Sequence, residues 1–138
     1  MRLTHHDLSI VLEDEWLAEA QMAGFSPTSN AYRTDLSFSI NGEPILEVRI
    51  ADVGPVGPVR CSIGIFRDSE DGVPALERVV KTLRGFRLGE AIPPVQIVEC
   101  GPDSQYPYKL TAEVHRFYCS LAAGFTHVPT LWGFDWNA

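Results

Sequence analysis

The pattern of apolar and polar positions predicts two core helices in the second half of the chain. The first runs from Pro74 to Gly85, with apolar residues at the i, i+3, i+4, i+7 spacing of one buried face. The second runs from Val114 to Ala123 and is followed by a glycine, a frequent helix stop. A third helical pattern covers residues 14–23 and opens with acidic side chains, which suit a helix N-terminus.

Short apolar or alternating runs predict the strands. The clearest is residues 45–50, in which apolar positions alternate with Glu47 and Arg49. Asn41-Gly42, just before it, is a hairpin signal. The other candidate extended segments are residues 8–12, 37–40, 60–66, 95–99, 106–110 and 127–131. From residue 45 the order of the regular elements is therefore strand, helix, strand, strand, helix, strand.

Length and composition indicate one globular domain. The chain has 138 residues, 45% hydrophobic and 21% charged. No apolar run approaches the roughly 20 residues that a membrane span needs, and the N-terminus lacks the apolar core of a signal peptide. Three widely spaced cysteines argue against a disulfide framework and a zinc ribbon. We expect a cytoplasmic protein with no membrane partner and no metal site.

The formal net charge of −7 opposes general nucleic-acid binding. Four basic residues nevertheless lie within ten consecutive positions, on the first core helix and just after it. They are Arg78, Lys81, Arg84 and Arg87. Their spacing makes a slowly winding stripe, which fits either a solvated helix face or a contact with phosphate or a partner.

The start of the second core helix carries the most informative chemistry. His115 and Arg116 stand in its first turn, where backbone N–H groups are unpaired and the helix dipole is positive. Arginine offers a rigid fork of donors that suits phosphate, and histidine adds one or two more. This combination predicts an anion site, with phosphate as the usual anion.

The chain resembles the ParB/sulfiredoxin family over roughly residues 45–131. The resemblance is carried by the element order and by three stretches of sequence. They are Ile92-Pro-Pro-Val-Gln-Ile-Val98, Tyr108-Lys-Leu110 and His115-Arg-Phe-Tyr-Cys-Ser-Leu-Ala-Ala-Gly-Phe-Thr-His-Val-Pro129. The resemblance implies an α+β fold with a small mixed sheet and two core helices in residues 45–138. Residues 1–44 are then an N-terminal extension packed on that core.

Families on this fold bind nucleotide phosphates at the corresponding turn. The resemblance therefore implies phosphate binding at His115, Arg116 and Phe117, and ATP or CTP with Mg²⁺ as the ligand. Glu113 or Asp52 would serve as a catalytic base or a magnesium ligand in a nucleotide hydrolase or phosphotransferase. Asp52 enters by analogy, because it follows the strand of residues 45–50.

Two departures from the family pattern bear on activity. Val114 stands where sulfiredoxin has its nucleophilic cysteine and where ParB has a glutamate, so sulfiredoxin activity is rejected. Cys119 lies more than a turn inside the helix and reads as a small buried hydrophobe. Glu113 stands where the family has glycine; it either repels phosphate or caps the helix, or else takes a catalytic role.

The alternative function is a non-catalytic interaction module that keeps the fold and has lost its chemistry. Trp132 and Trp136 lie close together near the C-terminus, either covering an edge of the core or forming an aromatic patch for a protein partner or a homodimer. The adjacent His5 and His6 would point to opposite faces of a strand, which favours a solvated N-terminus over a metal pair.

Overall fold

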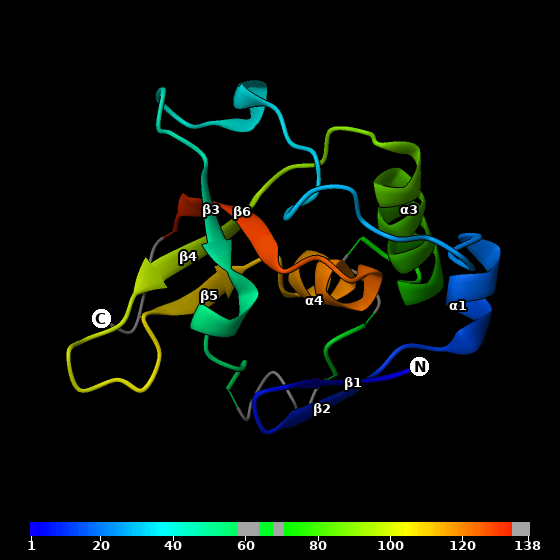
Figure 1. Cartoon of the computed structure of the whole chain (residues 1–138), viewed down its shortest axis with the longest axis horizontal. Coiled ribbons are helices and arrows are strands. Elements are labelled where there is room, and N and C mark those ends of the chain that lie inside the picture. The colour runs from blue at the N-terminus through cyan, green and yellow to red at the C-terminus, as the bar shows by residue number, and fades with distance from the viewer. Residues whose placement is uncertain (58–63, 68–70, 134–138) are drawn as a thin grey trace.

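The computed structural model describes residues 1–57, 64–67 and 71–133 (Figure 1). The described part is a mixed α+β protein with two sheets and three α-helices. Its strands are β1 (Arg2–His5), β2 (Leu8–Val11), β3 (Leu46–Arg49), β4 (Val95–Glu99), β5 (Tyr108–Ala112) and β6 (His127–Trp132). Its helices are α1 (Asp14–Glu19), α3 (Ala75–Leu88) and α4 (Val114–Ala123), with 3-10 turns at Leu36–Phe38 and Ile50–Asp52.

The larger sheet has the order β3-β6-β4-β5. The β3–β6 and β4–β5 pairs are antiparallel, whereas β4 and β6 are parallel, so the sheet is mixed as expected. A parallel pair needs a crossover connection, and here β5 and α4 supply it. The predicted order of elements from residue 45 onward is confirmed.

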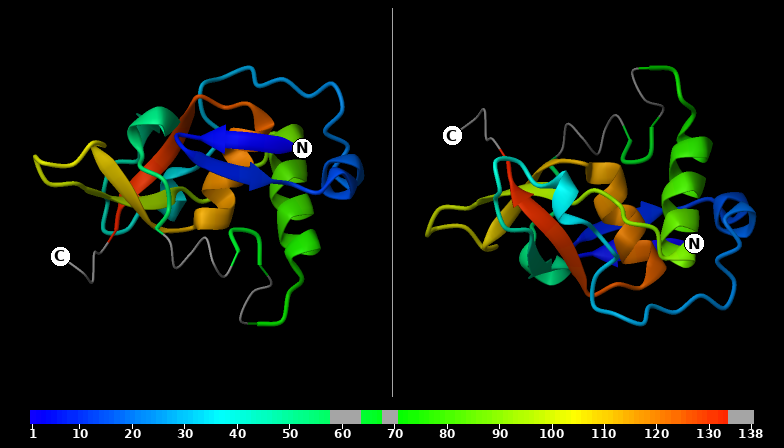
Figure 2. Two further views of the ribbon diagram at one scale, coloured as in Figure 1. Left: turned by 90° about the horizontal axis from the view of Figure 1, so that it is seen from below. Right: turned by 90° about the horizontal axis from the view of Figure 1, so that it is seen from above.

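The helices form successive layers on one side of this sheet. Figures 1 and 2 show α4 between the sheet and α3, with α1 packed against α3 at the outer end of the molecule. Phe117 and Tyr118 on α4 are fully buried, as are Val79 and Leu83 on α3. Burial of aromatic and aliphatic side chains at these contacts supplies most of the stabilisation of the two helices, because isolated helices of this length are marginal in water.

The N-terminal residues belong to the same core. The hairpin β1–β2 lies alongside α4, with its turn beside the segment that follows β3 (Figures 1 and 2). Ile10 and Leu12 from the hairpin segment, and Tyr32 after α1, join the hydrophobic cluster formed by α3, α4 and the sheet. Residues from the N-terminal part of the chain therefore help to complete the core.

The His5-His6 pair differs from its prediction. His5 is the last residue of β1 and is only 4% exposed. Its Nδ1 lies 3.1 Å from the Tyr118 hydroxyl and its Nε2 lies 3.2 Å from the Ile50 carbonyl oxygen. The expectation of a solvated N-terminus is wrong at His5, because the hairpin folds this end of the chain over α4.

Helix α3 is longer than its glycine predicted. Gly85 lies inside the helix, and the end comes at Gly89, whose φ of 69° is the left-handed conformation that glycine accepts readily. A Cβ at Gly85 would lie 2.8 Å from Ile92 Cδ1. The glycine therefore allows close packing of the segment that leads into β4, and it does not stop the helix.

Four local predictions need correction or fall outside the structure. Residues 37–40 form no strand: the segment holds a 3-10 turn, and Asp35 Oδ1 accepts from the Ser37 N–H at 2.8 Å. Asn41 and Gly42 do form a turn with positive φ, but it does not join two strands. The predicted helix over residues 14–23 ends early, at Glu19. The extended run at residues 60–66 lies mostly outside the described residues.

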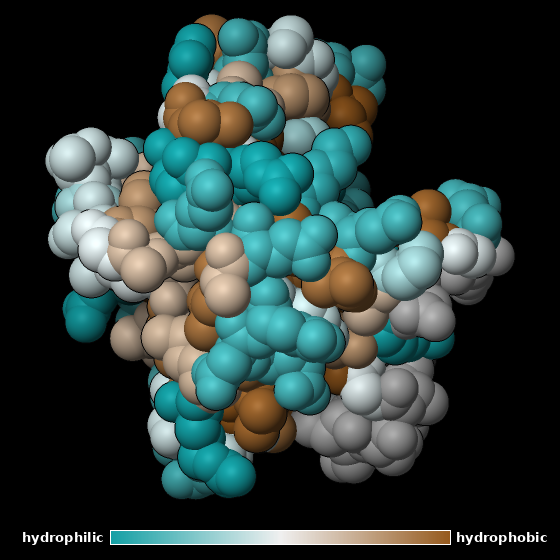
Figure 3. All heavy atoms as spheres, turned by 90° about the vertical axis from the view of Figure 1, so that its right-hand side faces the viewer, coloured by the Kyte–Doolittle hydropathy of each residue, from teal (hydrophilic) through white to brown (hydrophobic). Residues whose placement is uncertain are grey.

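The outer face around α1 and α3 is largely hydrophilic. Figure 3 shows hydrophilic side chains over most of it, with hydrophobic ones in small separate patches. Among the described residues, no helix is long and apolar enough to cross a membrane.

Candidate functional site

The site begins at the residue before α4. Glu113 is the N-cap of this helix and has φ 69° and ψ 41°, a left-handed conformation that is uncommon for a residue with a side chain. Glycine, which has no Cβ, adopts this conformation much more readily. A bend of this kind turns the chain sharply from β5 into α4 and leaves the first N–H groups of the helix facing outward.

Arg116 lies in the first turn of α4 and makes two contacts through Nη1. Its Nη1 lies 3.4 Å from Glu113 Oε2 and donates to the Pro94 carbonyl oxygen at 3.3 Å. The side chain of Arg116 is 21% exposed and that of Glu113 is 41% exposed. These two contacts position the guanidinium. Because both are made by Nη1, other N–H groups of the guanidinium can donate to a ligand.

A buried tyrosine supports the same corner. The Tyr32 hydroxyl donates to the Pro93 carbonyl oxygen at 2.7 Å, next to the proline that Arg116 contacts. Burial raises the pKa of Tyr32; the Arg116 charge lowers it and the Glu113 charge raises it. The hydroxyl therefore stays protonated, and its hydrogen bond holds the chain just before β4.

His115 and Phe117 have different roles from each other. His115 is 7% exposed and lines the cavity described below, with its ring edge-on to Phe66. Phe117 is fully buried, and its N–H donates to the Glu113 carbonyl oxygen at 3.0 Å. The expectation that Phe117 binds phosphate is therefore corrected: its side chain fills the core and its N–H makes the first hydrogen bond of the helix.

The start of α4 opens on a cavity shared with α3. The cavity has a volume of about 420 Å³, within the range of ligand pockets. Its walls come from α3, from residues 90–93 and from the first turn of α4. The charged or polar residues that line it are Arg78, Lys81, Thr82, Glu90, Glu113, His115 and Arg116. Two residues of the basic stripe thus meet the predicted anion site across this cavity.

The other half of the stripe has a structural role. Arg84 Nη2 donates to the Glu19 carbonyl oxygen at 3.2 Å, and Arg87 Nε donates to the Ala20 carbonyl oxygen at 3.1 Å. Both carbonyls belong to the end of α1, where acceptors are left unpaired and the helix dipole is negative. The stripe is therefore divided: two members line the cavity and two cap the end of α1.

Asp52 is placed apart from this cavity. It ends the 3-10 turn after β3, and the next residue, Val53, bridges to Tyr108 at the first position of β5. Glu113 follows Ala112, the last position of the same strand. Five residues of extended chain therefore lie between the position paired with Val53 and Glu113, a backbone length of roughly 16 Å. Asp52 and Glu113 therefore do not act on one bound group.

Cys119 and Ser120 on α4 are both buried, so neither is placed to act as a nucleophile. Cys119 is fully buried, and burial raises the pKa of its thiol. Ser120 is fully buried, and its hydroxyl donates to the Phe117 carbonyl oxygen at 2.7 Å. The description of Cys119 as a small buried hydrophobe is confirmed.

Metal binding by protein groups alone has no support in the described part of the chain. No group of three or more His, Cys, Asp or Glu side chains there is arranged to hold an ion. The carboxylates at the cavity are those of Glu90 and Glu113, so a magnesium ion would need most of its ligands from phosphate oxygens and water.

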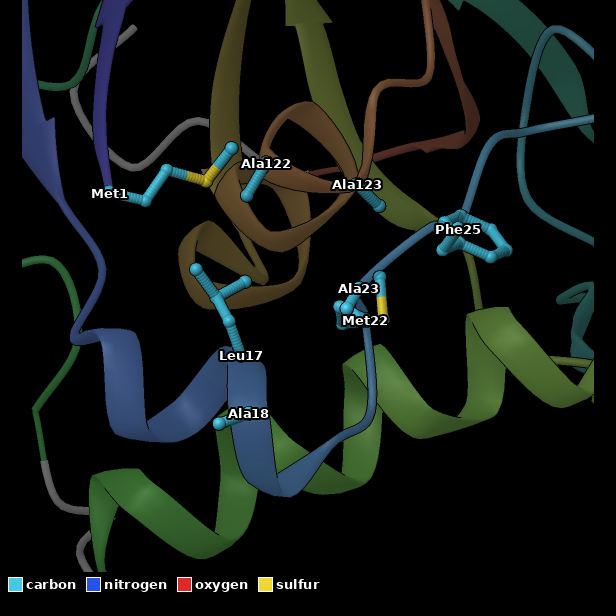
Figure 4. Close-up of a pocket in the computed structure, with 8 residues that line it drawn as sticks. All are labelled: Met1, Leu17, Ala18, Met22, Ala23, Phe25, Ala122 and Ala123. Carbon is cyan, nitrogen blue, oxygen red and sulfur yellow. The ribbon is translucent and has the colours of Figure 1, made fainter.

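A second cavity is apolar. It has a volume of about 380 Å³ and lies between α1 and α4 (Figure 4). In this view Leu17 points from α1 toward Ala122 on α4, and Met1 enters from the start of β1. The lining residues are Met1, Leu17, Ala18, Met22, Ala23, Phe25, Ala122 and Ala123. Because it has no charged or hydrogen-bonding side chain, this cavity offers no group for acid–base or phosphate chemistry.

One of the two C-terminal tryptophans is partly accessible. Trp132, at the end of β6, is 41% exposed and lines an open hollow with Val98 and Glu99. Its ring lies 6.2 Å from that of Tyr108. Trp136 lies outside the described residues. The expected aromatic surface therefore rests on Trp132.

Comparison with known proteins does not supply an identity. The chain has no significant match among protein-family models, curated proteins or solved structures. Its function is accordingly inferred from the geometry of the site.

Proposed function

We propose that this protein binds the phosphate end of a nucleotide in the cavity between α3 and α4. One observation carries the proposal: Arg78 and Lys81 from α3 line the same cavity as Arg116 and the first turn of α4. The sequence separates these groups by more than thirty positions, so only the fold makes them one basic surface.

The chemistry of these groups suits a phosphate. Arg116 presents a planar fork of donors, Lys81 a mobile ammonium, and the helix start adds a partial positive charge. Ile92 and Pro93 line the same cavity and offer an apolar wall for the rest of a ligand. An arrangement of a few cationic groups beside an apolar wall is typical of sites for small phosphorylated ligands.

The resemblance to the ParB/sulfiredoxin family agrees with this proposal. The α+β order, the mixed sheet and the helix from Val114 to Ala123 are compatible with that fold. Membership of the family remains part of the proposal.

Binding is better supported than catalysis. Glu113 is the one expected catalytic carboxylate that lines the cavity, and its carboxylate is engaged with Arg116. Asp52 lies away from it. We therefore place Arg116, His115, Arg78 and Lys81 in the binding role, and we propose hydrolysis or phosphotransfer only for a complex in which Glu113 is released from Arg116.

The test is isothermal titration of the purified chain with ATP, CTP, GTP and ADP, with and without Mg²⁺. We expect saturable binding of at least one nucleotide, and a loss of ten-fold or more in affinity for Arg116→Ala, because charge-assisted bonds to phosphate are worth about 1.5–3 kcal/mol. Arg49→Ala is the matched control, since Arg49 is exposed on β3 and does not line the cavity. Equal affinity of the Arg116→Ala chain and the wild type would reject the site.

The exposure of Trp132 favours a second candidate function, a protein-interaction module. An indole that is 41% exposed beside an open hollow is the type of group that anchors a partner. A pull-down with the wild-type chain should recover a specific protein that Trp132→Ala loses and Arg116→Ala retains. Recovery of the same protein by the Trp132→Ala chain would remove this candidate.

A further inference from the structure

The charges around the cavity are mixed, and this bears on which phosphate ligands fit. Three cationic side chains line it, together with two carboxylates. The cationic residues are Arg78, Lys81 and Arg116, and the acidic ones are Glu90 and Glu113. These five groups sum to one positive charge. A terminal phosphate group carries about −1.5 to −2 charges near neutral pH, so a single such group already neutralises the surplus.

Of the two carboxylates, Glu113 is the one in contact with Arg116. Its Oε2 lies 3.4 Å from Arg116 Nη1, and Glu113 is itself the N-cap residue of α4. The left-handed backbone at Glu113 and the contact of Arg116 with the Pro94 carbonyl hold the two side chains in this arrangement. A phosphate that reaches the helix start and Arg116 must therefore come close to the Glu113 carboxylate.

It is favourable for Arg116 to exchange its contact with Glu113 for a contact with one phosphate group. The Glu113–Arg116 pair is partly exposed and spans three residues of the chain, a class of ion pair that contributes little. A bidentate phosphate–arginine contact is stronger. Each further phosphate, however, adds negative charge near the same carboxylate, and the five charged groups of the cavity have no net positive charge left to offset it.

We propose that Glu113 is a specificity-determining residue that makes this cavity selective for ligands with a single phosphate group. The inference rests on the proposed function, and it narrows the ligand from nucleotides in general to monophosphates. It also explains the glutamate at a position where the backbone favours glycine. The side chain that causes backbone strain supplies the charge that prevents a second or third phosphate from adding affinity.

The experiment compares AMP, ADP and ATP by isothermal titration in a magnesium-free buffer at fixed ionic strength. In the wild-type chain we expect ATP to bind no more tightly than AMP. In Glu113→Gln the order should reverse, with ATP binding about ten-fold more tightly than AMP, because a repelling charge has been removed from a partly screened site. Glu113→Gly, which suits the left-handed backbone, removes the same charge and should give the same order.

The control is Glu99→Gln, which removes one negative charge at the other end of β4 and should keep the wild-type order. Affinity that rises from AMP to ATP in the wild type, or an unchanged ratio in both Glu113 variants, overturns the inference and leaves phosphate binding intact. Absence of binding by every nucleotide to every chain instead rejects the proposed function, and the inference with it.

Discussion

At the scale of single residues, the neutral imidazole of His5 connects separate parts of the fold. The Ile50 carbonyl can only accept, so His5 Nε2 carries the proton, and Nδ1 accepts from the Tyr118 hydroxyl. The Tyr118 oxygen in turn accepts from the Val56 N–H at 3.4 Å. One tautomer therefore joins the N-terminal hairpin, α4 and the segment after β3. Burial lowers the pKa of His5, since a charged ring would lose its hydration there.

This arrangement predicts a stability that depends on pH. The folded pKa of His5 lies below the value of 6.5 for a free imidazole, so the unfolded chain binds a proton first as the pH falls. The contribution of His5 is complete above about pH 6.5 and is lost as the pH falls through the folded pKa. Urea unfolding at pH 7.5, 6.5 and 5.5 measures this loss.

His5→Gln provides the comparison for that series. We expect it to reduce the free energy of unfolding at pH 7.5 by about 1–3 kcal/mol, because one buried partner is left poorly bonded. The difference between the two chains should shrink toward pH 5.5. A difference that is constant across the series would contradict the assignment of a neutral buried imidazole.

At the scale of elements, α1 depends on α3. It has six residues, no basic side chain in its last turn and no buried residue within its bounds, so it has little stability of its own. The guanidinium groups of Arg84 and Arg87 supply the missing donors at its C-terminal carbonyls. This contact fixes the position of α1, and α1 in turn supplies Leu17 and Ala18 to the wall of the apolar cavity (Figure 4).

Arg87→Ala should therefore destabilise the protein by about 1–2 kcal/mol, because a partly buried, charge-assisted hydrogen bond is lost. Lys81→Ala, on the same helix and exposed, is the control and should change the free energy of unfolding by less than about 0.5 kcal/mol. Chemical denaturation of both variants gives the comparison. Equal effects would show that Arg87 behaves as a solvated residue.

At the scale of the whole molecule, residues 1–44 and 45–138 share one hydrophobic core. Ile10, Leu12 and Tyr32 are each at most 3% exposed and belong to the cluster that includes α3, α4 and the sheet. Burial of side chains of this size contributes roughly 1.5–3 kcal/mol each. Their sum is comparable to the net stability of about 5–15 kcal/mol of a typical domain.

A fragment of residues 45–138 should consequently fail to fold cooperatively. We expect poor dispersion of its amide resonances and no sigmoidal unfolding transition, whereas the whole chain shows both. A cooperative transition of the fragment would mean that residues 45–138 form an independent domain and that residues 1–44 are an addition to it.

Local chemistry made much of the fold predictable. The helix from Val114 to Ala123 has the bounds expected from its sequence, because Gly124 adopts a left-handed conformation that ends it. The strand at Val95–Glu99 also lies where the apolar run placed it. Signals of this kind act within one or two turns of chain, so a single sequence contains them.

Packing overrode the local signals elsewhere. Gly85 resembles a helix stop in sequence, yet the helix continues because the lack of a side chain is used for the contact with Ile92. His5 resembles a solvated terminal residue, yet its partners Ile50 and Tyr118 come from distant parts of the chain. No periodicity reports such contacts, because they depend on which elements become neighbours.

The candidate site, like the fold, was predictable from the sequence only in part. The sequence by itself indicated His115 and Arg116 as candidates for anion binding, since residue type and position at a helix start are local properties. Only the tertiary structure decided that Arg78 and Lys81 join them, that Phe117 is buried in the core, and that Asp52 lies at the far end of β5. The physical reason is that a binding surface is a sum over neighbours in space, and the packing of α3 against α4 chooses those neighbours.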